Sequence, residues 1–207
     1  MKKALEVARD PLYSTFPAYF LALAHLMAEQ IEEAEAALEL SIRCQKTGFD
    51  IFIPLHQGLS GLLLVMKGEM GRGIRLIEEA ARLHKERGEK GYAIVPQLFL
   101  GTVYGQMAIG GERPPLGVVI KNLGFLLKTL PFAARKAEFH LTALIAECRK
   151  YGLRGVLGQA LLILGRVHHA KKRPDKARKC LAEAEGLFEQ VGAEVFLRQT
   201  REALAAL

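Results

Sequence analysis

The chain of 207 residues contains no tryptophan and only three cysteines. Cys44, Cys148 and Cys180 are far apart in the sequence, and none belongs to a Cys-x-x-Cys pair. An odd, scattered set of this kind argues against a disulfide framework and indicates a reducing compartment. We therefore expect a cytoplasmic protein whose cysteines are core or half-buried residues.

Long apolar segments are also missing. No unbroken apolar run approaches the roughly 20 residues that a helix needs to cross a bilayer. The N-terminal segment Met1-Lys2-Lys3-Ala4-Leu5-Glu6 becomes polar too soon for a secretory signal. The sequence thus predicts no contact with a membrane.

Residue patterns that carry chemistry are absent as well. The glycine-rich stretch 68–73 lacks the Gly-Lys-Ser/Thr ending of a phosphate-binding loop, and Ser60 is outside the Gly-x-Ser-x-Gly register of a nucleophilic serine. His168 and His169 are adjacent, so on a helix they point about 100° apart and cannot bind one ion together. The other histidines have no His or Cys at metal-ligand spacing. We expect a protein that is not an enzyme, with no catalytic residues, no metal and no cofactor.

Positive charge is concentrated in the second half of the chain. Residues 1–103 hold 12 Lys/Arg against 13 Asp/Glu, whereas residues 104–207 hold 17 against 9, and the whole chain has a formal charge of +7. The densest basic run is Lys171-Lys172-Arg173-Pro174-Asp175-Lys176-Ala177-Arg178-Lys179. A basic half can attract nucleic acid, which is the alternative function. Because no aromatic residues interleave to stack on bases, a solvated helix start is favoured and a nucleic-acid partner is not expected.

The feature that is present is a repeated pair of small residues, twelve positions apart. It occurs at Ala22 and Ala34, at Gly61 and Gly73, and at Gly165 and Ala177. Apolar or small residues follow four and seven positions after each second member: Leu38, Ser41, Ile77, Ala80, Leu181 and Ala184. This spacing indicates two antiparallel helices in close contact, repeated along the chain. The abundance of Ala, Leu, Glu, Lys and Arg, which are strong helix formers, also favours an all-α fold.

Turn signals predict where the helices begin and end. We expect one repeat domain over residues 1–207, made of pairs at about 12–47, 53–87, 92–151 and 153–191, with a capping helix at 193–206. Gly48 is expected to hold the left-handed position that ends the first pair. The individual helices are predicted at 12–29, 31–47, 53–67, 71–87, 92–109, 115–130, 132–151, 153–172, 174–191 and 193–206.

The repeat is interrupted once. The first small residue recurs at Ala22, Gly61, Gly101 and Gly165, in steps of 39, 40 and then 64 residues. The long step leaves room for one inserted helix, at about 115–130, which Pro131 separates from the next. This helix is either a structural spacer or a docking element, and the spacer interpretation is favoured.

The pattern resembles the tetratricopeptide family. Leu100-Gly101 with Tyr104 keeps that family's Leu-Gly pair and following aromatic, while Leu164-Gly165 has His168 in the aromatic position. The resemblance implies a right-handed superhelical solenoid of antiparallel helix pairs. The residues expected to pack the repeats together are Ala22, Ala34, Gly61, Gly73, Gly101, Tyr104, Gly165 and Ala177.

A second resemblance concerns the C-terminal part, from Leu130-Pro131-Phe132-Ala133-Ala134-Arg135 through Gly158-Gln159-Ala160 to Leu197-Arg198-Gln199. It is similar to the C-terminal repeat region of bacterial multidomain signalling proteins that combine a nucleotide (adenylate or guanylate) cyclase domain with an ATPase domain. That resemblance implies that catalysis resides in other domains, and that the partner is either a separate protein or an N-terminal domain of a longer chain.

In tetratricopeptide arrays the first helix of each pair lines a concave surface that binds a peptide or helix. Carried onto this chain, that surface would be apolar at its N-terminal end and polar and basic toward the C-terminus. We therefore expect a protein-interaction or scaffold module, with a regulatory role, that binds a peptide or amphipathic helix. The array's own curl, a homodimer or a missing segment could cover the same positions instead. The predicted surface residues are Phe16, Tyr19, Leu23, Leu26, Met27, Leu55, Leu62, Val65, Met66, Leu98, Thr102, Gln106, Leu162, Arg166 and His169.

Overall fold

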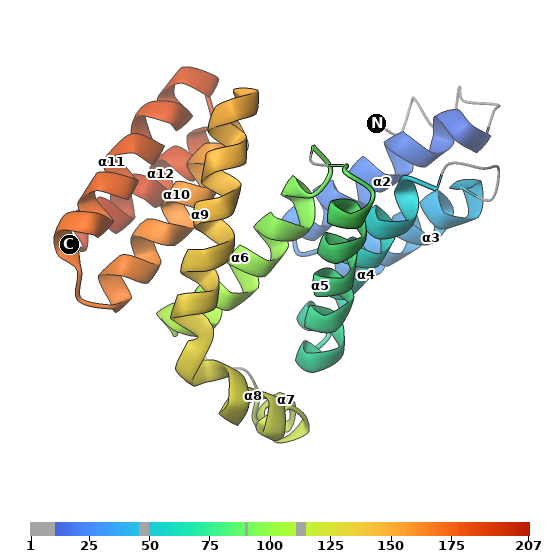
Figure 1. Ribbon diagram of the computed structural model, residues 1–207, viewed down its shortest axis with the longest axis horizontal. Helices are drawn as coiled ribbons and strands as arrows, with labels where there is room; N and C mark the ends of the chain where they lie inside the picture. Colours follow the sequence, from blue (N-terminus) through green and yellow to red (C-terminus); the bar gives the residue numbers. More distant parts are fainter. Residues whose placement is uncertain (1–10, 46–49, 90, 111–114) are drawn as a thin grey trace. The chain divides into compact units, whose positions relative to one another are not determined.

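The computed structural model describes residues 11–45, 50–89, 91–110 and 115–207. These residues form helices and contain no β-strand, so the all-α prediction is confirmed. Figure 1 shows the helices in chain order. Their bounds are α2 (Pro11–Met27), α3 (Ile31–Gln45), α4 (Phe52–Met66), α5 (Met70–Glu86), α6 (Ile94–Ile109), α7 (Leu116–Lys121), α8 (Leu123–Thr129), the 3-10 helix η1 (Leu130–Phe132), α9 (Ala133–Tyr151), α10 (Arg154–Ala170), α11 (Pro174–Val191) and α12 (Glu194–Ala205).

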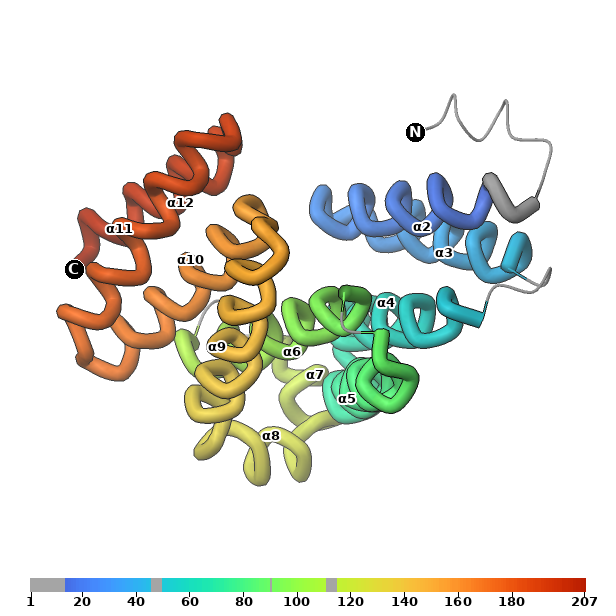
Figure 2. The backbone as a smooth tube through the Cα atoms, turned by 45° about the horizontal axis from the view of Figure 1, so that its top comes forward, coloured from blue at the N-terminus to red at the C-terminus, as the bar shows by residue number. Residues whose placement is uncertain are grey.

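The chain divides into two compact units, Met1–Pro96 and Gln97–Leu207. In the first unit, α2 pairs with α3 and α4 with α5, while α3 also contacts α4. In the second, α10 pairs with α11, α9 packs on α10 and α12 packs on α11. The paired helices run side by side as hairpins in both tube and ribbon views (Figures 1 and 2).

The small residues twelve positions apart lie where the paired helices touch. Ala22 and Ala34 are both fully buried between α2 and α3. In the next pair, a Cβ added to Gly61 would lie 2.6 Å from the carbonyl oxygen of Gly73, so the two backbones are in direct contact. In α10, a Cβ at Gly165 would meet the Leu181 side chain at 2.7 Å. The repeated small residues therefore allow each pair to pack closely.

The turns inside these three pairs are also equivalent. The residue seven positions after the first small residue has a positive φ in each case: Glu29 (58°), Gly68 (81°) and Lys172 (55°). The next backbone N–H donates to a carbonyl five residues earlier, as in a Schellman turn. These bonds are Gln30 N to His25 O (2.9 Å), Glu69 N to Leu64 O (2.7 Å) and Arg173 N to His168 O (3.0 Å). The sequence repeat is thus a repeat of local structure.

The pair predicted at 92–151 is built differently, because α6 packs on α9 across a long stretch of sequence. A Cβ at Gly101 would lie 2.5 Å from the Cδ2 atom of Leu141 on α9. Tyr104 is fully buried, accepts a hydrogen bond from Lys136 Nζ (2.9 Å) and stacks on the His140 ring at 5.8 Å. In sequence, α7, α8 and η1 lie between the two packed helices.

The single helix predicted at 115–130 is wrong, because the structure has two short helices, α7 and α8, that meet at Asn122. The Asn122 side-chain amide donates to the Val118 carbonyl (2.8 Å), and such a local bond competes with regular helix geometry. The helix end predicted at Gly48 lies outside the described residues.

Candidate binding surfaces

An apolar stripe runs along the exposed side of α2. Phe16 is 41% exposed, Phe20 51% and Met27 68%, and Leu23 is half-buried. Their spacing of four, three and four residues places them on one face of the helix. Phe20 was missing from the predicted surface, although its position four residues after Phe16 could have revealed it.

The expectation for Tyr19 is corrected by the structure. Its side chain is only 2% exposed and points into the first unit, where its ring lies 6.3 Å from Phe52 and 6.0 Å from His56. Burial raises the pKa of the Tyr19 hydroxyl. Tyr19 therefore belongs to the core that joins α2 to α4, not to the exposed stripe; Leu26 and Leu55 are buried in the same way.

Helix α4 continues the apolar surface of the first unit. Phe16 on α2 contacts Phe52 on α4, with ring centroids 4.5 Å apart. Farther along α4, Met66 is 42% exposed and Leu62 and Val65 are half-buried. The two first helices of this unit are thus in contact, and both present apolar side chains to solvent.

A buried polar network crosses the same unit and was not found from the sequence. The Ser41 hydroxyl donates to the Thr15 carbonyl (2.9 Å), so the neighbouring His56 Nε2, at 2.8 Å, donates to Ser41 Oγ. The His56 Nδ1 atom lies 2.7 Å from the Gln45 side-chain amide. The Gln45 atom in this contact is Oε1. Burial lowers the pKa of His56 to about 4, which disfavours the charged ring.

This network resembles a serine–histidine pair but lacks the geometry for nucleophilic catalysis. The Ser41 side chain is fully buried, and its proton is directed at a carbonyl oxygen rather than at the histidine. His56 lines an open cleft of about 290 Å³ together with Gln45, Ile53 and Gln57, whereas Ser41 does not reach it. The network fixes α3 against α2 and α4.

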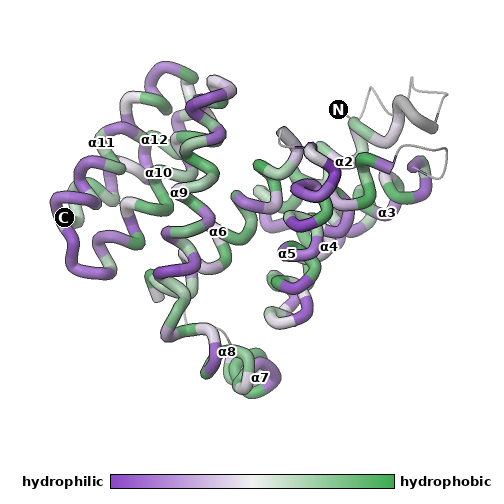
Figure 3. The backbone as a smooth tube through the Cα atoms, viewed as in Figure 1, coloured by the Kyte–Doolittle hydropathy of each residue, from purple (hydrophilic) through white to green (hydrophobic). Residues whose placement is uncertain are grey.

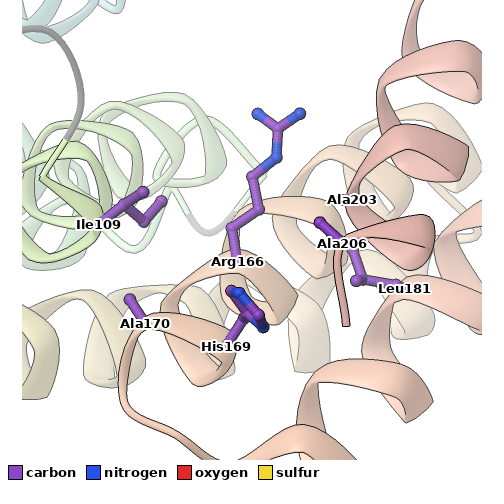
Figure 4. Close-up of a pocket in the computed structure, with 7 residues that line it drawn as sticks. All are labelled: Ile109, Arg166, His169, Ala170, Leu181, Ala203 and Ala206. Carbon is purple, nitrogen blue, oxygen red and sulfur yellow. The ribbon is translucent and has the colours of Figure 1, made fainter.

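In the second unit, two predicted surface residues meet in one cleft. Arg166 and His169 line a depression of about 290 Å³ between α10 and α12, shown in Figure 4. Arg166 donates to the Gln199 carbonyl (3.3 Å), and its guanidinium points away from His169. The other lining residues are Ile109, Ala170, Leu181, Ala203 and Ala206.

The remaining predicted residues of this unit do not enter that cleft. On α6, Gln106 is exposed, and Leu98 and Thr102 are half-buried. Leu162 on α10 is only 3% exposed and belongs to the core. The structure therefore brings Arg166 and His169 together and leaves Leu98 and Gln106 apart from them.

The basic run at the start of α11 is exposed. Arg173 donates to Glu138 (2.9 Å), and this ion pair neutralises one positive charge of the basic run. The other basic side chains lie in solvent at the turn before α11 and along its first turns: Lys171, Lys172, Lys176, Arg178 and Lys179.

Two features are absent from the described residues, a metal-binding cluster and a membrane-spanning helix. No group of three or more His, Cys, Asp or Glu side chains in this part of the chain is arranged to hold a metal ion. Among the helices of the same residues, none combines the length and the apolar character needed to cross a bilayer.

Comparison with known proteins gives no family for this chain. No protein-family model matches it, and no curated protein sequence matches it either.

Proposed function

We propose that the chain is a tetratricopeptide-like interaction module, without enzymatic activity, that binds an amphipathic helix or apolar peptide on the first helices of its pairs. The observation that carries this proposal is the exposed apolar stripe of α2, formed by Phe16, Phe20, Leu23 and Met27. Contiguous exposed apolar surface of this kind marks interaction sites on soluble proteins.

The chemistry of the stripe suits a helical ligand. Phe16 and Phe20 offer rigid rings, while Met27 on α2 and Met66 on α4 offer unbranched, flexible side chains that adapt to different apolar partners. A ligand helix with apolar residues at positions i, i+3, i+4 and i+7 would cover such a stripe. The proposal extends to a regulatory or scaffolding role in the cytoplasm, with the partner in another protein or in a domain that precedes these repeats.

A displayed library of helical peptides tests this function. The selected peptides should share an amphipathic apolar face, and the double substitution Phe20→Asp with Met27→Asp should weaken their binding by more than about tenfold. Both side chains are exposed, so helical circular dichroism should be unchanged. Val195→Asp, at an exposed apolar position of α12 (60%), is the matched control. If the selected peptides bind the α2 double variant as tightly as the wild type, the α2 stripe is not the binding site.

A nucleic-acid-associated role is the second candidate, supported by the exposed lysines around α11. It predicts retention on nucleic acid that falls steeply with salt concentration. Substituting Lys172 and Lys176 with Glu should remove that retention. Absence of any binding at low salt would eliminate this candidate.

A further inference from the structure

The inserted segment α7–η1 leaves many of its large apolar side chains exposed to solvent. Helix α7 contributes no buried residue to the protein. In α8 only Thr129 is buried, and that side chain is polar. The large apolar side chains that face solvent are Leu116 (74% exposed), Ile120 (66%), Leu123 (50%), Leu127 (67%), Leu130 (48%) and Phe132 (54%).

This segment projects from the second unit. In Figures 1 and 2, α7 and α8 extend from the N-terminal end of α9, away from α10, α11 and α12. Figure 3 colours much of the two helices as hydrophobic. A Cβ added to Gly117 or Gly124 would have no neighbour within 4 Å, which places both glycines in open space. The segment is therefore a protruding apolar tip, whereas the two clefts described above lie on other elements.

The charged residues within and just after the inserted segment have one sign. From Pro115 to Ala137 the sequence contains no Asp or Glu, and its charged residues are Lys121, Lys128, Arg135 and Lys136. Lys121 and Lys128 are exposed on the tip itself. The residues from 104 to the C-terminus carry 17 Lys/Arg against 9 Asp/Glu, so the surrounding unit is basic as well.

We propose that the α7–η1 tip docks on an anionic lipid surface, with Leu116, Ile120, Leu123 and Leu127 entering the interface and the neighbouring lysines contacting acidic headgroups. A lipid surface accepts protruding apolar side chains without a matched cavity, and basic residues strengthen the attachment. A second copy of the chain fits less well, because two such tips in contact would bring their lysines together. Such surface docking needs no spanning helix, but it departs from the sequence-based expectation of no membrane contact. The tip and the α2 stripe are formed by different helices.

Sedimentation of the 207-residue chain with lipid vesicles tests the proposal. The chain should bind vesicles of phosphatidylcholine mixed with phosphatidylglycerol, bind phosphatidylcholine alone more weakly, and be released by salt. Leu123→Glu with Leu127→Glu should lower the partition coefficient by more than about tenfold. Lys128→Gln should lower it by about fivefold.

Val191→Glu with Val195→Glu, at exposed apolar positions of the same unit (42% and 60%), is the matched control and should leave vesicle binding unchanged. Circular dichroism verifies that each variant is folded, and analytical ultracentrifugation reports self-association. The proposal is overturned if mixed vesicles do not bind the chain, or if the α8 substitutions leave binding intact. It is also overturned if those substitutions convert a dimer into a monomer while vesicles bind neither form, because the tip would then be a subunit interface.

Discussion

Gly61 and Gly73 face each other across the α4–α5 pair, with the carbonyl oxygen of each next to the Cα of the other. Gly165 on α10 likewise lies against Leu181 and the Ala177 carbonyl on α11, and Ala22 and Ala34 are both fully buried in the α2–α3 pair. The close approach of the paired helices therefore depends on a small residue, glycine or alanine, at the point where the two helices touch.

Gly61→Ala tests this contact. The added Cβ would lie 2.6 Å from a backbone oxygen, which cannot move without displacing α5. We expect a loss of about 1–3 kcal/mol in the free energy of unfolding, measured by urea denaturation. Gly186→Ala on α11 is the control, because nothing lies within 4 Å of its new Cβ, and it should gain about 0.5–1 kcal/mol. Equal changes in the free energy of unfolding for the two variants would contradict a tight contact at Gly61.

The positive φ of Lys172 gives a second prediction. Lys172 occupies the turn position that Gly68 holds in the α4–α5 pair, and a side chain is disfavoured there. Lys172→Gly should stabilise the second unit by about 1 kcal/mol, and Gly68→Lys should destabilise the first by a similar amount. Thermal unfolding of both variants measures the two shifts, and shifts of the same sign would be inconsistent with equivalent turns.

The lowered pKa of His56 should make the free energy of unfolding depend on pH. Its pKa is lowered to about 4 in the folded protein, below the ordinary value of 6.5, because the ring is buried. The unfolded chain therefore binds the proton first, and the free energy of unfolding decreases as pH falls from about 6.5 to 4. The loss from this residue is about 3 kcal/mol.

Denaturation at several pH values, with the wild type and His56→Gln, isolates that contribution. Burial also lowers the pKa values of His84 and His168, so part of the acid sensitivity should remain in the variant. An identical pH profile for the two proteins would show that His56 does not titrate as the buried network requires.

Much of the fold could be predicted from local signals. The helix pairs followed from the small residues at Ala22, Gly61 and Gly165, and the helix ends from turn residues such as Gly68 and Pro174. These signals lie within about a dozen residues of one another, so they can be recognised in a single sequence.

Features that depend on distant contacts could not be predicted. Gly101 was recognised as a packing residue, but its partner Leu141 lies 40 residues away, beyond the inserted helices. Tyr19 lies three residues after Phe16 and four before Leu23, a spacing that also fits a residue of the exposed stripe. Only its contact with Phe52 on α4 shows that it is buried. The Ser41–His56 bond likewise joins two helices whose contact no local pattern describes.

The proposed binding function depends most directly on the α2 stripe, and the methyl resonances of its methionines report whether a ligand is bound there. The chain has five methionines, of which Met27 and Met66 lie on the proposed surface and Met107 lies on α6 in the other unit. With methyl-labelled methionine and a selected amphipathic peptide, the account predicts large shifts of the Met27 and Met66 signals and none of Met107. Saturating peptide that shifts Met107 while Met27 stays unchanged would contradict it.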